Sequence, residues 1–336
     1  MSIDPRISTA FERDNGFPLA PHLLVFARMG SHSHGTYLPP EEPDGVDDVD
    51  LVGFLVPPVE YHLGLPRWQH WRLQFEELDI IVYSLDKAVR LLLKSNPNIL
   101  GVLWLREEDY VHRHPLFDSL MRERAIFSSQ IAAEAFVGYA YDQLKRMEAF
   151  DRHRMAEYEA LSAQIGPQEL LSEVLEADAA KLQHIATSQG LPADLLQRFR
   201  KLHREHFSGY MGKKRKAMVR RHQYDVKNAA HLIRLLRMGS EFLRTGVLEV
   251  FRTTDAEELR RIKRGGWSLE QVKAEAKPLF AGITAARLHS PLPPQPDTEA
   301  ANRLLMRLQC EMLHLGPAWE SPTDRAVSPP AVVPRE

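Results

Sequence analysis

Two aspartates separated by one residue follow a glycine-containing segment near the start of the chain. Residues 30–53 have the sequence GSHSHGTYLPPEEPDGVDDVDLVG, which begins with Gly30-Ser31 and carries Asp48 and Asp50 near its end. In a β-strand alternate side chains share a face, so the two carboxylates would point the same way. Such a pair can hold a divalent metal ion, and backbone N–H groups of a glycine-rich turn can bind phosphate. The segment therefore predicts a site for a nucleoside triphosphate.

Metal-assisted nucleotidyl transfer uses two or three carboxylates that hold Mg²⁺ against the phosphates. We expect the third carboxylate on a neighbouring strand, and Asp79 directly precedes the apolar segment IIVY. Glu76, Glu77 and Asp86 are alternatives, but each of them lies at the end of a predicted element. Asp48, Asp50 and Asp79 are therefore the predicted catalytic and metal-binding residues.

The same motifs also occur without any catalytic role. A Gly-Ser turn is common in loops, and an acidic stretch is often a solvated turn. The order of the elements favours catalysis, because a strand, a Gly-Ser turn, a loop and an Asp-x-Asp strand follow one another. Within the turn, the hydroxyl of Ser31 is suited to donating to a phosphate oxygen. His32 and His34 could bind metal or phosphate, or could simply tolerate the turn geometry.

The elements that must position these residues follow from the pattern of apolar positions. Strands are predicted over 23–29, 48–55 and 78–83. Ser84 can cap a helix that follows it. Further helical spacing is present over 116–163, 166–206, 224–245, 268–277 and 298–314. The predicted fold class is α+β, with a small mixed-sheet core over 1–115, a mostly helical region over 116–285, and a last helix with a Pro-rich, disordered tail over 286–336.

Composition places the chain among ordinary globular proteins. It has 336 residues, 44% hydrophobic residues, a formal net charge of -2 and one cysteine, Cys310. A single cysteine excludes an intramolecular disulfide and is typical of a reducing cytosol. Because a secretory signal and an apolar run of about 18 residues are both missing, the sequence predicts a cytoplasmic protein without a membrane partner.

Basic residues are concentrated in one part of the chain. Residues 198–237 contain thirteen Lys or Arg and only two acids. The densest segment is GKKRKAMVRRH at 212–222, with four consecutive cations at Lys213, Lys214, Arg215 and Lys216. Such a local excess is typical of contact with a triphosphate or with an RNA backbone. The alternative is a solvated helix face.

A second polar group lies on the helix predicted after Tyr224. Lys227, His231 and Arg234 are about one turn apart in YDVKNAAHLIRLL, so they can form a polar stripe. We predict that Lys227 and His231 line the cleft for the nucleotide, and that Asn228 could do so as well. The alternative is a core helix with one hydrated side.

These motifs resemble those of the DNA polymerase β-type nucleotidyltransferase superfamily, whose members share a Gly-Ser turn and an Asp-x-Asp strand. Three further segments make the chain similar to predicted nucleotidyltransferases associated with bacterial RNA repair: YSLDKAVRLLLKSNPNILGVLWL at 83–105, FVGYAYDQLKRM at 136–147 and YDVKNAAHLIRLLRMGSEFLRTG at 224–246. The resemblance covers the first 147 residues and about 209–270. Residues 150–208 carry no such motif, and we interpret them as an insertion.

The resemblance implies transfer of a nucleoside monophosphate from an NTP, ATP among them, with Mg²⁺ or Mn²⁺ as cofactor. It implies that Gly30 and Ser31 bind the triphosphate, that Asp48 and Asp50 bind metal, and that Asp79 completes the set. We expect the acceptor to be an RNA end, in RNA repair or processing. The alternatives are AMPylation-like nucleotidylation of a partner protein, in a regulatory or toxin–antitoxin pair, and a non-catalytic scaffold.

Overall fold

The structure is a computed structural model of the whole chain. It describes residues 3–42, 44–45, 47–149, 152–206 and 213–315. The predicted Pro-rich tail over 316–336 lies outside the described residues.

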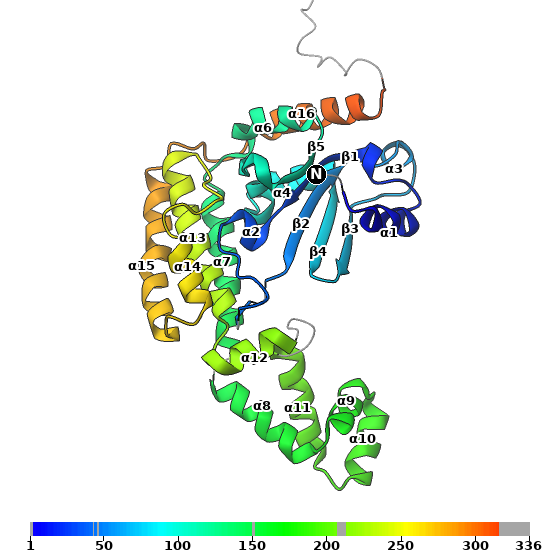
Figure 1. Cartoon of the computed structure of the whole chain (residues 1–336), viewed down its shortest axis with the longest axis vertical. Helices are drawn as coiled ribbons and strands as arrows, with labels where there is room; N and C mark the ends of the chain where they lie inside the picture. Colours follow the sequence, from blue (N-terminus) through cyan, green and yellow to red (C-terminus); the bar gives the residue numbers. More distant parts are fainter. Residues whose placement is uncertain (1–2, 43, 46, 150–151, 207–212, 316–336) are drawn as a thin grey trace, which may run out of the picture.

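A mixed five-stranded sheet forms the centre of the N-terminal region (Figure 1). Its strands are β1 (Leu23–Arg28), β2 (Val49–Leu55), β3 (His70–Phe75), β4 (Leu78–Ser84) and β5 (Tyr110–Arg113), in the spatial order β3-β4-β2-β1-β5. Strands β2 and β4 are parallel, whereas the other neighbouring strands are antiparallel. The predicted mixed sheet is therefore confirmed.

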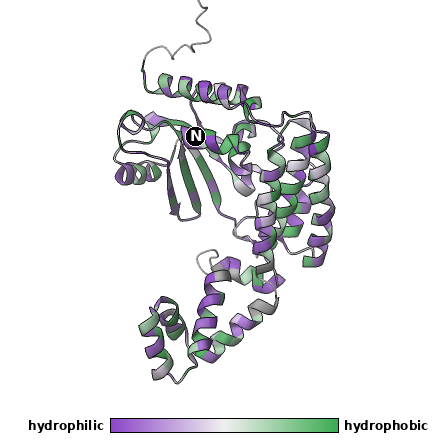
Figure 2. Ribbon diagram, turned by 180° about the vertical axis from the view of Figure 1, so that it is seen from behind, coloured by the Kyte–Doolittle hydropathy of each residue, from purple (hydrophilic) through white to green (hydrophobic). Residues whose placement is uncertain are grey.

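The sheet is buried on both faces, because successive side chains of its central strands enter two different cores. In β1, Val25 and Ala27 belong to the core shared with the helices, whereas Phe26 belongs to a smaller core on the opposite face. The strands are mostly green in Figure 2, whereas the helices show both hydrophobic and hydrophilic positions.

Helix α1 (Pro5–Asn15) covers the smaller core. Its Phe11 packs edge-on against Trp71 at 5.1 Å between ring centroids. The indole of Trp68 donates a hydrogen bond of 2.7 Å to Asn15. The tryptophans of the 66–71 segment are thus part of the packing against α1.

The helices beside the other face form the larger core with the sheet. These are α4 (Leu85–Leu93), α5 (Pro97–Leu100), α7 (Ala132–Ala149), α13 (Val226–Thr245), α14 (Ala256–Lys263) and α15 (Leu269–Leu288). The α13 helix is buried over most of its length and packs against both α7 and α15. Helix α16 (Thr298–Met312) returns to pack on α4.

Short helices complete this region: α2 (Gly30–Ser33), α3 (Glu60–Leu63), α6 (Phe117–Arg122), and the 3-10 helices η1 (Ala20–His22), η2 (Gly101–Trp104), η3 (Glu107–Asp109) and η4 (Arg124–Phe127). A separate group of helices, which we call the lobe, extends away from the sheet (Figure 1). The lobe consists of α8 (Arg152–Ile165), α9 (Gln168–Glu176), α10 (Ala179–Ser188), α11 (Ala193–His206) and α12 (Lys213–His222).

The α+β fold class is confirmed. Strands β3 and β5 were not predicted, and the Gly-Ser segment forms one helical turn where a turn and loop were expected. In the described part of the chain, no helix combines the length and apolar character needed to cross a membrane. The proposed domain boundaries stay predictions.

Candidate active site

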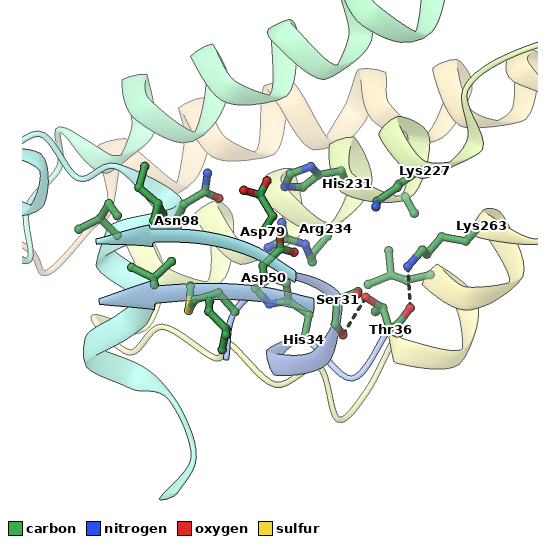
Figure 3. Close-up of a pocket in the computed structure, with 18 of the residues that line it drawn as sticks. Ser31, His34, Thr36, Asp50, Asp79, Asn98, Lys227, His231, Arg234 and Lys263 are labelled. Carbon is green, nitrogen blue, oxygen red and sulfur yellow. Dashed lines mark hydrogen bonds between the residues drawn. The ribbon is translucent and has the colours of Figure 1, made fainter. Parts of the chain in front are cut away.

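A cavity of about 310 Å³ lies between the helix-facing side of the sheet and helices α13 and α14 (Figure 3). Its lining includes Gly30 and Ser31, the strand residues Asp50 and Asp79, and side chains from helices far along the chain. Ligand pockets in proteins usually have volumes of about 300–1,000 Å³, so this cavity can take part or all of a nucleotide.

The Gly-Ser turn lies directly against a carboxylate. Gly30 has a φ of 63°, and a Cβ atom added there would come within 1.8 Å of Oδ2 of Asp50. The backbone N–H of Met29 donates to the carbonyl oxygen of Asp50 at 2.8 Å, which fixes β1 beside β2. Only glycine permits both this backbone conformation and this close approach.

Two of the predicted carboxylates are neighbours. The parallel register of β2 and β4 pairs Asp50 with Asp79, and both side chains line the cavity. Burial is the main cause that raises the pKa of Asp50 to about 6; the negative charges of Asp79, Asp48 and Asp47 act in the same direction, and Lys227 opposes them. This site therefore concentrates negative charge that a cation would neutralise.

The third carboxylate already has a partner. Both oxygens of Asp79 accept from Arg72 on β3, at 3.0 and 2.7 Å. The Arg72 side chain is 61% exposed, so this pair contributes at most about 1 kcal/mol to stability and can open. Of the three alternatives, Glu76 bonds Arg6 and Asp86 accepts from Ser84, and none of the three lines the cavity.

Asp48 precedes β2 and is exposed, and it is not among the residues that line the cavity. Its charge nevertheless contributes to the raised pKa of Asp50.

Cations from the helical region form the opposite wall of the cavity. Lys263 on α14 is only 5% exposed, donates to the carbonyl oxygen of Thr36 at 2.8 Å, and forms an ion pair with Asp47. Lys227 on α13 lies 3.3 Å from the other oxygen of Asp47. Burial lowers the pKa of Lys263 to about 8, although Asp47 opposes this shift. The buried carboxylate of Asp47 thus fixes both lysines at the cavity.

Arg234 lines the same wall and differs from the other buried arginine nearby. It is 7% exposed, and Nη1 donates to the sulfur of Met238 at 3.1 Å, but none of the described carboxylates forms an ion pair with it. Burial lowers its pKa to about 9, and the charge of Arg252 adds to this effect. A buried guanidinium without a counter-ion indicates a place for an anionic ligand.

Two histidines of the lining are neutral at physiological pH. Burial and the nearby Arg234 hold the pKa values of His34 and His231 well below their usual range. The ring of His34 is fixed by a 2.9 Å hydrogen bond between Nδ1 and the carbonyl oxygen of Val250. His32, by contrast, stacks on Tyr37 at 3.8 Å between ring centroids.

The basic run on α12 lies outside the cavity lining. Arg215 pairs with Asp225 at 2.9 Å and donates to Asn228 at 2.8 Å, at the N-terminus of α13. Arg215 therefore stabilises the N-terminus of α13. Lys214 is exposed, and the side chains of Lys213 and Lys216 lie outside the described residues.

The donor set suits a hard divalent cation, because it consists of carboxylate oxygens with an excess of negative charge at Asp50. The described residues contain no ready-made group of three or more metal-binding side chains. Asp50 and Asp79 would hold the ion, and Asp48 could join them from the adjacent backbone. The side-chain types at this site, and their closeness to one another, therefore suit a divalent cation.

Lys263, Arg234 and Thr36 were not singled out as site residues. Arg234 was recognised as part of a polar stripe, but its burial beside Asp50 could not be inferred from that stripe. For Lys263, the basic segment RRIKRG gives no indication of which cation turns inward.

Comparison with known proteins supports the interpretation of the N-terminal region. Residues 9–159 match the family model described as the RNA repair pathway DNA polymerase beta family. This segment contains all five strands but ends before α13 and α14. No curated protein matches the sequence.

One solved structure is similar, that of a nucleotidyltransferase-like protein from Exiguobacterium sibiricum 255-15. The alignment has 10% identity and a TM-score of 0.25, and it covers 90% of this chain and 80% of the other. A similarity this weak establishes nothing about the arrangement of the site.

Proposed function

We propose that the chain is a nucleotidyltransferase that transfers a nucleoside monophosphate from an NTP to an RNA end, because residues 9–159 match the model of the RNA repair pathway DNA polymerase beta family. In this reaction an acceptor hydroxyl attacks the α-phosphorus, a new P–O bond forms, and pyrophosphate leaves.

The observation that supports this proposal best is the division of the cavity into two walls of opposite charge. Figure 3 shows Asp50 and Asp79 on the strands, with Lys227, His231 and Arg234 opposite them on α13. A triphosphate needs cations for its phosphate oxygens and a metal ion beside its α-phosphate. Both requirements meet in this one cavity.

The metal ion supplies charge neutralisation and polarisation at the phosphates when it is bound. Asp50 and Asp79 would hold it, and Asp48 would contribute after a local adjustment. Arg72 must release Asp79 for this to happen, which its exposure allows. We propose Mg²⁺, or Mn²⁺ in its place.

The cationic wall would hold the β- and γ-phosphates. Lys263 and Ser31 lie near one end of the cavity in Figure 3, with Thr36 beside them, whereas Asn98 lies at the other end. We therefore place the leaving pyrophosphate near Ser31 and Lys263. Its charge is neutralised there by side chains that are already fixed before substrate binds, which lowers the reorganisation cost of the transition state.

The decisive experiment compares two aspartate variants. We expect Asp50→Asn to lower transfer from α-labelled NTP by roughly 100-fold or more, because a preorganised charged group at the reacting phosphate is lost. Asp86→Asn serves as the matched control, since Asp86 is a carboxylate next to the sheet, in the first turn of α4, but does not line the cavity. Equal activity of the two variants would exclude the assignment of Asp50.

The acceptor is tested in the same reaction. Each labelled NTP is incubated with the enzyme, Mg²⁺ or Mn²⁺, and either total RNA or total protein. Label on RNA is the expected result. Label on protein alone would replace the RNA proposal with nucleotidylation of a partner protein.

A further inference from the structure

The lobe carries a concentration of positive charge that the catalytic cavity does not use. Residues 198–222 contain ten Lys or Arg and a single acid, Glu205, in a chain of net charge -2. These residues belong to α11 and α12, whereas the cavity lining ends at α13 and α14.

Helices α10 and α11 enclose a second hollow of about 480 Å³. Three cations on one face of α11 line it, together with one amide and one apolar side chain: Arg200, Lys201, Arg204, Gln197 and Leu182. We call this hollow the lobe groove. No aromatic side chain lines it, so it offers cations to a backbone and no platform for stacking bases.

Two of these cations differ from two other arginines of the lobe. Arg200 and Lys201 form no ion pair with any described residue. On the same helix, Arg198 pairs with Glu157 at 2.6 Å. Arg220 on α12 pairs with Glu159 at 3.4 Å. Acids of the lobe therefore neutralise Arg198 and Arg220 but not the two groove cations.

We propose that the lobe groove binds the phosphate backbone of the RNA acceptor. Cations gathered in one groove can neutralise phosphates of a bound strand without reading its sequence. This inference rests on the proposed function, because it assigns an RNA to the enzyme as its acceptor.

The lobe is joined by ionic contacts to a loop next to the active site. Arg221 and His222, at the end of α12, both contact Asp44 at 3.0 Å. Asp44 lies in the loop that leads to Asp48 and β2. The lobe, which extends away from the sheet in Figure 1, is thus connected to the strand that carries Asp50.

The test uses two double variants of the full-length protein with the same loss of charge. Arg200→Gln with Lys201→Gln empties the groove of its unpaired cations. Arg198→Gln with Arg220→Gln removes two cations that are already paired. Binding of a fluorescein-labelled single-stranded RNA of about 20 nucleotides is followed by anisotropy at several salt concentrations, and thermal unfolding checks that both variants fold.

We expect the groove variant to bind RNA about tenfold more weakly at low salt. The slope of log affinity against log salt should fall by about 1.4, because each phosphate contact on a single strand contributes about 0.7. The control should stay within about twofold of the wild type. An equal loss in both variants, or no loss in either, would overturn the proposal.

Transfer assays separate this inference from the proposed function. With an RNA too short to reach the lobe, the groove variant should transfer as well as the wild type. If the wild-type protein binds RNA through the lobe groove but transfers no nucleotide to it, the proposed function is wrong. The proposed role of the groove in RNA binding is then still supported. Unchanged RNA affinity with lost labelling of a protein acceptor would assign the groove to a protein instead.

Discussion

Two buried arginines near the cavity differ in whether the protein itself compensates their charge. Arg252 is 1% exposed and is bonded by Glu241 and Asp255, so its charge is compensated within the protein. Arg234 is nearly as buried, but the described residues provide no carboxylate that pairs with it. The ion pairs of Arg252 stabilise the fold. Burial of Arg234 without an ion pair is unfavourable for folding, and a bound anionic ligand would offset that unfavourable free energy.

For this reason we predict that Arg234→Gln keeps or raises the stability of the ligand-free protein. Loss of an uncompensated buried charge removes a desolvation cost and a repulsion with Arg252. The KM for NTP should rise by roughly tenfold to 100-fold, because hydrogen bonds to a charged group contribute about 1.5–3 kcal/mol. Urea unfolding and steady-state kinetics measure the two effects.

The control for that prediction is Arg252→Gln, which we expect to lower stability by about 3–5 kcal/mol. It leaves Glu241 without this partner and Asp255 with Arg237 alone. A similar loss of stability in both variants would show that Arg234 serves the fold and holds no ligand.

The lowered pKa of Lys263 predicts a pH dependence with opposite signs for binding and stability. As pH rises through about 8, Lys263 loses its proton and the cavity loses a cation, so the KM for NTP should rise by up to about tenfold per pH unit. In the unfolded chain the lysine keeps its proton to about pH 10.4. The unfolded state therefore binds more protons between these values, and the contribution of Lys263 to stability becomes more favourable with rising pH.

Kinetics between pH 7 and 9.5 test this dependence. Lys263→Arg should flatten the KM profile, because a guanidinium stays charged throughout that range. An unchanged rise in KM with this variant would assign the titration to another group.

At the scale of elements, the one-turn helix α2 places the backbone of Gly30 against Asp50. We predict that Gly30→Ala abolishes transfer and lowers stability by about 1–3 kcal/mol beyond the backbone cost, since the new Cβ overlaps the carboxylate. The control is Gly16→Ala at the end of α1. Its φ is 78° but nothing lies within 4 Å of an added Cβ, so only the backbone cost of roughly 1–2 kcal/mol applies.

Equal losses of stability in the two variants, measured by urea unfolding, would contradict the close approach at Gly30. Full transfer activity of Gly30→Ala would also contradict it.

The elements that could be predicted from the sequence are those with a clear pattern. Strand β1 is a continuous buried apolar run, and α13 has helical spacing with Asp225 as its cap. Strand β3 was missed although HWRLQF alternates polar and apolar residues, because it directly follows a Pro-rich segment that was interpreted as a loop. Strand β5 has only four residues, none of them fully buried. Four residues are too few to reveal a period of two.

Some residues of the candidate site could likewise be predicted from the sequence, and others could not. Gly30, Asp50 and Asp79 could be proposed because their motifs are local. That Lys263 reaches Thr36 depends on the packing of α14 beside α2, more than 200 residues away along the chain. The Arg72–Asp79 pair depends on the register between β3, which was not predicted, and β4. Contacts between residues so far apart along the chain cannot be inferred from the local sequence pattern.

At the scale of the whole molecule, the loop over 38–48 connects three parts. Glu42 bonds Arg264 on α14, Asp44 bonds Arg221 and His222 on α12, and Asp47 bonds the cavity lysines. The sheet, the helices opposite it and the lobe are therefore joined by carboxylates of one loop.

The contact at Asp44 gives the prediction for this scale. Asp44→Asn should lower stability by no more than about 1 kcal/mol, because Arg221 is half exposed. It should nevertheless free the end of α12, so hydrogen exchange of that helix should accelerate, as expected for local opening. Transfer to a long RNA should then lose efficiency by about threefold or more, since about 0.6–1 kcal/mol of positioning is lost, while transfer to a short RNA stays unchanged.

Glu42→Gln is the matched control, because it removes a carboxylate of the same loop whose partner, Arg264, lies on α14 and not on the lobe. It should leave the exchange of α12 and the preference for long RNA as they are in the wild type. If Asp44→Asn and Glu42→Gln change the exchange of α12 and the preference for long RNA alike, the two carboxylates of the loop act together to stabilise one arrangement. In that case the lobe has no separate connection to the active site. A change confined to Asp44→Asn would instead mean that the position of the lobe, set through one ionic contact, determines how well a long acceptor is presented to the cavity.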